Sequence, residues 1–224
     1  MIGDVKKPSA ILQRMADFDN EAIMSALAIQ FPLRAMTAGF RKFTVDEYER
    51  LISAGIITED DNLELLEGYL VNKMGHNPPH AGTIAVVQAA LLQLQIVGWN
   101  VRVQLPFRAS TSEPEPDFAI VRGDHRSYLR RHPVSSDVGL AVEVADSTLD
   151  SDRSDKVRVY SRDAIGTYWI VNLVDSQVEV YTDPQPDSAP PTYATRRDFQ
   201  PGQSLPLVLD GLTMAMIPVV DLLP

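Results

Sequence analysis

The segment "VGLAVEVA", residues 138–145, is an almost uninterrupted apolar run that contains one charged residue, Glu143. A run of this kind usually forms a central strand that is covered on both of its faces. It therefore predicts a sheet with packing layers on both sides. The run also poses a chemical question, because a buried carboxylate needs a partner or a metal ion.

Local patterns predict the elements that precede this strand. Thr44 and Glu47 form a capping box, which predicts a helix over residues 45–54. Two short apolar runs flank Glu67 and Gly68, which favours a β-hairpin that turns there. Pro78 and Pro79 predict a loop, followed by a helix that begins near His80.

The remaining elements alternate in a regular order. We expect strands at residues 101–107, 117–121 and 138–145, a helix over 153–163, and strands in "TYWIVNL" and "QVEVYTD". Asp152 is interpreted as the N-cap of that helix. Together with the helix that begins near His80, the order is α-β-β-β-α-β, which predicts an α/β (α+β) fold with a mixed sheet and helices packed on it.

The chain divides into two predicted parts. Residues 1–38 look separable and favour short amphipathic helices, so we expect an N-terminal helical extension there. Residues 39–224 contain all the patterns described above and are predicted to form one domain.

Composition excludes several classes of protein. The chain has no cysteine, which rules out disulfides, thiolate zinc sites and cysteine nucleophiles and fits a reducing compartment. We see no secretory signal, and the uncharged stretch 81–101 is interpreted as a core helix rather than a membrane span, so a cytoplasmic location is expected. The net charge of −10 argues against a broad basic face. Two local basic runs, 121–132 and 152–162, could be solvated surface or could bind phosphates.

Carboxylates are the candidate chemical groups, because the sequence lacks the G-x-S-x-G, G-x-x-x-x-G-K-[ST], G-x-G-x-x-G and H-E-x-x-H motifs. Glu143 could pair with an arginine, and Asp117, which follows Pro116, could be a turn residue. Taken together, on neighbouring strands and before a helix that carries a lysine, the two acids indicate a site for a hard divalent cation such as Mg²⁺.

A set of motifs in fixed order resembles a known family. Glu64 in "LELLEG" comes first, followed by His80, Pro116–Asp117, "VEVADSTLDSDRSDK", "YWIVNL" and "VEVY". In this order they resemble the Uma-two family, described as restriction endonucleases within the PD-(D/E)XK nuclease superfamily. The resemblance covers residues 43–184 and leaves residues 1–38 outside.

The resemblance implies a restriction-endonuclease-like core, preceded by a helix and a β-hairpin. It implies that Asp117 and Glu143 hold Mg²⁺ or Mn²⁺, with Glu64 as a third ligand or a water-orienting group. One departure concerns Ala145, which occupies the usual lysine position; the resemblance then assigns the lysine role to Lys156. The implied catalytic residues are therefore Asp117, Glu143 and Lys156.

The implied activity is metal-dependent hydrolysis of phosphodiester bonds, with DNA as the expected substrate. Two alternatives remain open at this point. The chain could be a non-catalytic binding protein that retains the nuclease fold, which the net charge of −10 favours, or a hydrolase of a small phosphorylated molecule. A homodimer is expected by symmetry if both strands of a duplex are cut.

Overall fold

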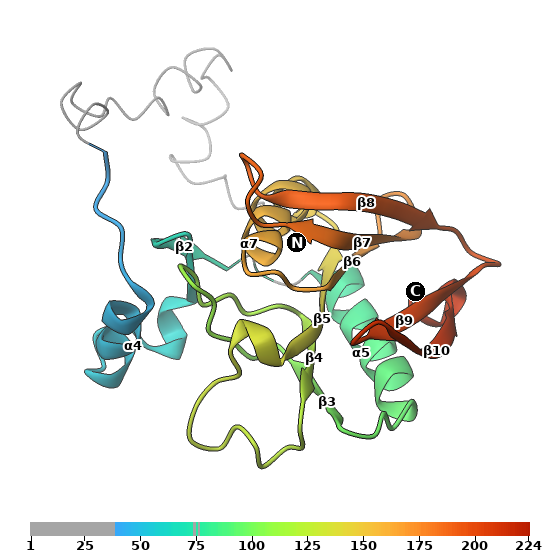
Figure 1. The fold of residues 1–224 in the computed structure, drawn as a ribbon, viewed down its shortest axis with the longest axis horizontal. Coiled ribbons are helices and arrows are strands. Elements are labelled where there is room, and N and C mark those ends of the chain that lie inside the picture. Colours follow the sequence, from blue (N-terminus) through green and yellow to red (C-terminus); the bar gives the residue numbers. More distant parts are fainter. Residues whose placement is uncertain (1–38, 74, 76) are drawn as a thin grey trace, which may run out of the picture. The chain divides into compact units, whose positions relative to one another are not determined.

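The computed structural model describes residues 39–73, 75 and 77–224 (Figure 1). The predicted helical extension over residues 1–38 lies outside the described residues, so the boundary at residue 39 stays a prediction. Residues Lys42–Pro224 form one compact unit.

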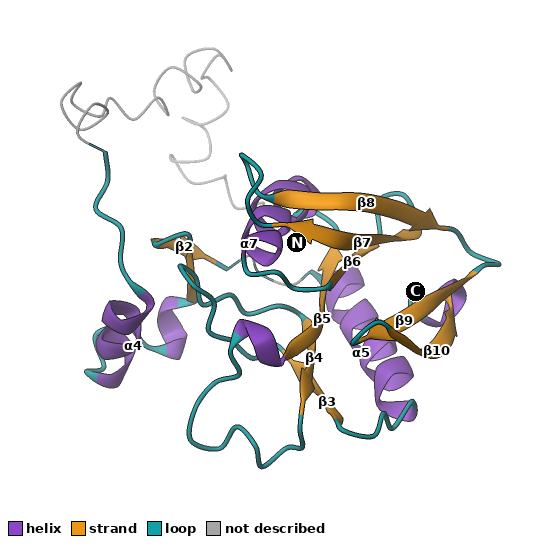
Figure 2. Cartoon of the chain, in the orientation of Figure 1, coloured by secondary structure: helices purple, strands orange, loops and turns teal. Residues whose placement is uncertain are grey.

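A six-stranded mixed sheet forms the centre of this unit, with the strand order β3-β4-β5-β6-β7-β8 (Figure 2). Its strands are β3 (Trp99–Val103), β4 (Phe118–Arg122), β5 (Val138–Ala145), β6 (Thr167–Asn172), β7 (Gln177–Gln185) and β8 (Thr192–Phe199). The apolar run over residues 138–145 is β5, and it lies between β4 and β6 with every residue but Gly139 buried. The prediction of a covered central strand is therefore confirmed.

The pairing of β5 with β6 is parallel, whereas all other neighbouring strands of this sheet pair antiparallel. Parallel neighbours need a crossover, and a helical segment supplies it here. This segment consists of α6 (Leu149–Ser151), a π-helical stretch (Asp152–Lys156) and α7 (Val157–Arg162).

The two faces of the sheet carry different layers, because successive side chains of a strand point to opposite faces. Leu140, Val142 and Val144 of β5 pack in one cluster with Ile84 and Val87 of α5 (Pro78–Gln93). The alternate residues of β5, Ala141 and Ala145, pack in a second cluster with α7. Helices α5 and α7 thus cover opposite faces, and Glu143 belongs to the face of α7.

Smaller elements flank the sheet. They are α4 (Val45–Ser53), a 3₁₀ turn (Glu59–Asp61), β1 (Leu63–Leu66), β2 (Tyr69–Asn72), a 3₁₀ turn (Ser135–Asp137), β9 (Ser204–Leu209), β10 (Leu212–Pro218) and a final 3₁₀ turn (Val219–Asp221). Thr44 and Glu47 form the predicted capping box at the start of α4. The predicted hairpin is β1–β2, and Glu67 (φ 51°) and Gly68 (φ 86°) provide the left-handed conformations that its tight turn requires.

The predicted fold class and element order are confirmed, with four local corrections. The strand predicted over residues 101–107 is β3, Trp99–Val103, and it ends before Gln104, whose φ of 49° is left-handed. Pro78 and Pro79 are not in a loop but are the first residues of α5, where a missing N–H costs nothing and Asn77 caps the helix by accepting a hydrogen bond from the His80 amide. The crossover helix begins at Leu149, four residues before the predicted start. Strand β8 was not predicted from the sequence.

Candidate nuclease site

Strand register brings Asp117 and Glu143 together. Phe118 of β4 pairs with Val142 of β5, so the antiparallel register places Asp117 opposite Glu143. Both residues lie on the face that α7 covers, because Asp117 shares its side of the sheet with Ala119 and Glu143 shares its side with Ala141. Two acids that are far apart in the chain thus become cross-strand neighbours.

Hydrogen bonds connect the two acids directly. The Asp117 amide donates to Glu143 Oε2 at 3.1 Å, and the Val144 amide donates to Asp117 Oδ2 at 2.8 Å. Asp117 Oδ1 accepts a bond from Gln104 Nε2 at 3.3 Å and lies 3.4 Å from His80 Nε2. The side chain of Asp117 is thereby held in one orientation from three directions.

Lys156 contacts two of the predicted site residues. Its ammonium donates to Glu64 Oε2 at 2.9 Å and lies 3.3 Å from Glu143 Oε1. Glu64 Oε2 also accepts a bond from the Glu115 amide at 3.1 Å. The structure therefore brings all four predicted residues into one cluster, and it places Glu64 beside the lysine as its ion-pair partner.

The π-helical stretch directs two charged side chains into the cluster. Asp152 and Lys156, four residues apart, are both buried. Asp152 has helical backbone angles, and its Oδ2 accepts a hydrogen bond from Thr148 Oγ1 at 2.6 Å. The prediction that Asp152 is an N-cap is wrong, because the helix has already begun at Leu149 and Asp152 points its carboxylate toward the site cavity.

Tyr160 is a buried partner that sequence reasoning did not find. Its hydroxyl donates to Glu143 Oε1 at 2.6 Å. It lies on α7, one helical turn after Lys156, so one helix face supplies both groups that contact this oxygen. Together with the Asp117 amide, they give the buried carboxylate the partners that it requires.

Burial is the largest influence on the pKa values of the acids in this cluster. Burial raises the pKa of Glu143 to about 8, with Asp117 and Asp152 adding to the effect against Lys156. Burial likewise raises the pKa of Asp152 to about 6. Burial acts to lower the pKa of Lys156, but Glu143 and Glu64 outweigh it, so this pKa is raised and the lysine stays charged. The hydrogen bond to Asp117 raises the pKa of His80.

A cavity of about 390 Å³ opens onto these groups. Seven carboxylates line it, against two lysines and one histidine. The acids are Glu64, Glu115, Asp117, Glu143, Asp146, Asp152 and Asp155. Such an excess of negative charge at one cavity favours a cationic ligand.

Two of the carboxylates in the cluster suit a hard cation such as Mg²⁺. Asp117 and Glu143 offer two carboxylates, which is the number that Mg²⁺ commonly takes from a protein, while water and substrate oxygens complete its shell. Within residues 39–73, 75 and 77–224, no three His, Asp or Glu side chains converge into a ready ligand set. The excess of carboxylates around Asp117 and Glu143 is the observation that supports a cation, because a positive charge there would offset their mutual repulsion.

Known proteins that resemble this chain include proteins described as nucleases. The model of the Uma2 family, described as "Putative restriction endonuclease", matches residues 45–217. A crystal structure from Anabaena variabilis ATCC 29413, described as "a putative nuclease belonging to DUF820", is similar with a TM-score of 0.54 at 14% identity, over 80% of this chain and 97% of that chain. At this identity the likeness shows the fold alone. No curated protein matches the chain. Because the family model covers most of the chain, the protein belongs to the Uma2 family.

Proposed function

We propose that this protein is a Mg²⁺-dependent endonuclease that hydrolyses phosphodiester bonds in DNA. One observation carries the proposal: two buried carboxylates from neighbouring strands and one buried ammonium meet at a single cavity. Membership of a family described as restriction endonucleases supports the same reading.

The residues of the site have separable roles in this proposal. Asp117 and Glu143 would hold the cation, and Mn²⁺ could replace Mg²⁺ because both take oxygen ligands. When bound, the cation would lower the pKa of a coordinated water and neutralise charge on the phosphate. Gln104 and His80 orient the carboxylate of Asp117.

Lys156 would stabilise the charge that develops on the phosphate. Its ammonium is charged and faces the cavity, although Glu64 and Glu143 hold it at 2.9 and 3.3 Å. A fixed positive charge in a water-poor site stabilises such a transition state more strongly than it could in bulk water. Glu64 then acts as the group that positions the lysine.

The alternative of a non-catalytic binding protein rests on two observations. The net charge is −10, and the charged groups of the cluster already pair with one another. In that case the cluster would be a structural ion-pair network, and metal would not be needed for any activity.

A plasmid-nicking assay separates the two readings. Purified protein is incubated with supercoiled DNA in Mg²⁺, in Mn²⁺ and in EDTA, with an RNA of similar length as a parallel substrate. The proposal predicts nicked or linear DNA in the presence of metal and intact DNA in EDTA. Absence of cleavage under all conditions would contradict it, and cleavage of RNA alone would correct the substrate.

Two further expectations belong to the same proposal. A homodimer would place two such sites on the two strands of a duplex, and light scattering at several concentrations measures this. Within the described part of the chain, no helix is long and apolar enough to span a membrane; the predicted cytoplasmic location awaits fractionation.

A further inference from the structure

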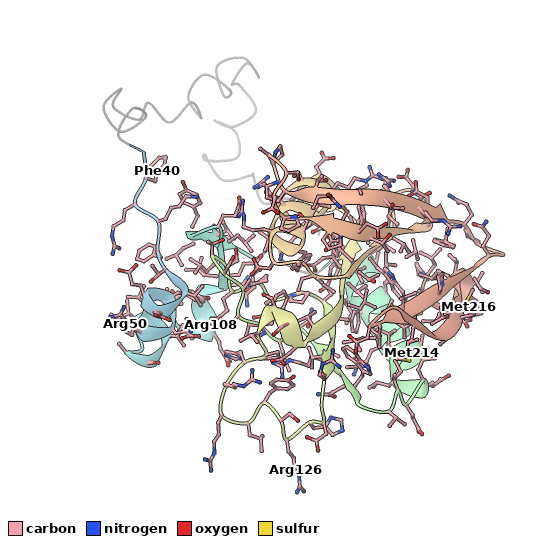
Figure 3. All side chains as sticks on the ribbon, viewed as in Figure 1. Phe40, Arg50, Arg108, Arg126, Met214 and Met216 are labelled. Atoms are coloured by element: carbon pink, nitrogen blue, oxygen red, sulfur yellow. The ribbon has the colours of Figure 1, made fainter. Side chains whose placement is uncertain are left out.

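The loop that joins β4 to β5, residues 123–134, concentrates positive charge at the surface of an otherwise acidic chain. It contains three arginines and two histidines and only one acidic residue, Asp124. Arg126 and Arg130 are exposed, and Figure 3 shows Arg126 at the outer tip of the loop, pointing away from the sheet.

The nearby carboxylates are already engaged by other groups. Asp124 Oδ1 accepts hydrogen bonds from the amides of Arg126 and Ser127 at 2.9 and 3.0 Å, which closes a turn. Asp137 pairs with Arg131 at 2.9 Å. Within the described residues, no carboxylate lies at ion-pair distance from the guanidinium of Arg126 or Arg130. Their charges are therefore available to a ligand.

Internal contacts hold this loop in place. The ring of Tyr128 contacts two guanidinium groups, that of Arg102 at 5.7 Å and that of Arg131 at 5.1 Å from its centroid. Its hydroxyl donates to the backbone oxygen of Arg122 at 2.5 Å. A loop fixed in this way presents its outward cations with little further loss of conformational freedom on binding.

The loop is connected to the candidate site by one short strand. β4 runs from Phe118, next to Asp117, to Arg122, where the loop begins. Five residues of strand span about 16 Å, which is about half of the 34 Å turn of a DNA duplex. A duplex with a phosphodiester at Asp117 is therefore long enough to reach the loop within one turn.

We propose that Arg126 and Arg130 bind backbone phosphates of a DNA duplex whose scissile phosphodiester lies at the Asp117–Glu143 cavity. The inference rests on the proposed nuclease function and adds the surface that holds the duplex. Guanidinium groups suit this role because they bind phosphate oxygens in a bidentate manner. Contacts of this kind position the duplex and carry no sequence preference.

The test compares two double variants that remove the same charge. Arg126→Ala/Arg130→Ala removes the proposed contacts, and Arg50→Ala/Arg197→Ala removes two exposed arginines from α4 and β8. Binding of a fluorescent 20-base-pair duplex is measured in EDTA over a range of salt concentrations. Each lost phosphate contact should reduce the slope of log K against log salt by about 0.9. The loop variant should therefore lose about 1.8 in slope and, at 0.1 M salt, about 60-fold in affinity.

The outcomes distinguish this inference from the proposed function. If the wild type nicks plasmid but the loop variant keeps wild-type affinity and slope, the loop assignment is overturned while the nuclease assignment stands. An equal loss in the control variant also overturns it, because the effect would then be one of net charge. If the wild type neither binds nor nicks DNA, both proposals fall.

Discussion

Replacement of Lys156 by methionine tests whether the buried cluster is held together by its single ammonium. Lys156 is 8% exposed, and its ammonium lies 2.9 Å from Glu64 and 3.3 Å from Glu143. Methionine keeps most of the volume of the side chain and leaves both carboxylates without their cation. Removing one partner of a buried ion pair costs about 3–5 kcal/mol, which for a chain of this size lowers Tm by about 6–20 °C.

The unfolding free energy lost in Lys156→Met should increase with pH. Without the ammonium, the pKa of Glu143 should rise further above the value of about 8 that burial already produces. A carboxyl group whose folded pKa exceeds its unfolded pKa contributes most stability below the unfolded pKa, and this stability is lost as pH rises through the folded pKa. The gap in unfolding free energy between wild type and Lys156→Met should therefore be wider at pH 9 than at pH 6.

Urea unfolding followed by circular dichroism, at pH 6 and pH 9, measures both effects. Lys73→Met is the matched control, because Lys73 pairs with Glu115 at 3.0 Å but both side chains are 26% exposed. We expect a cost of about 0–1 kcal/mol for this control. If Lys156→Met lowers the unfolding free energy no more than Lys73→Met does, or if its effect does not change with pH, Lys156 does not hold the cluster together.

Three further predictions use the same cluster. In the absence of metal, the stability of the wild type should fall between pH 5 and pH 8, since burial raises the pKa of Glu143 to about 8 and that of Asp152 to about 6. Urea midpoints measured across this range should therefore fall more steeply for the wild type than for Glu143→Gln. Mg²⁺ at about 100 times its Kd should stabilise the wild type by about 2.7 kcal/mol, reversibly with EDTA, and a melting scan of Glu143→Gln should show no such gain. Asp152→Asn should reduce plasmid nicking while its Tm at pH 8 does not fall, because it removes a buried charge that faces the cavity; undiminished nicking would show that Asp152 has no part in the reaction.

The elements that sequence reasoning found are those whose signals are local. The apolar run of β5, the capping box at Thr44 and the turn at Glu67 each act within a few residues, so periodicity and turn chemistry were sufficient. Strand β8 was missed because only its second residue, Tyr193, and its last, Phe199, are buried, and it depends on pairing with β7. The two prolines of α5 were predicted to lie in a loop because proline breaks the interior of a helix. Proline is, however, favoured in the first turn of a helix, where its missing N–H needs no partner.

The part of the site that lies on one face of the sheet could be predicted from the sequence. Asp117 and Glu143 fall on the same face because of strand alternation, which the sequence contains. The pairing of Lys156 with Glu64 joins residues 92 positions apart, and no local pattern specifies it. Asp152 carried a usable signal, since it precedes Lys156 by four residues and so shares its helix face, but the helix start was placed too late for that spacing to be read.

The role of the two carboxylates is measured by the rate of plasmid cleavage in Mg²⁺ for the wild type, Asp117→Asn, Glu143→Gln and Glu113→Gln. Glu113 is the control because it is buried, at 3% exposure, and does not line the cavity. We expect Asp117→Asn and Glu143→Gln each to lose about 10²–10³-fold in cleavage rate, as when a group that organises transition-state charge is removed, while Glu113→Gln cleaves at the wild-type rate. Cleavage by Glu143→Gln at the wild-type rate would contradict this role.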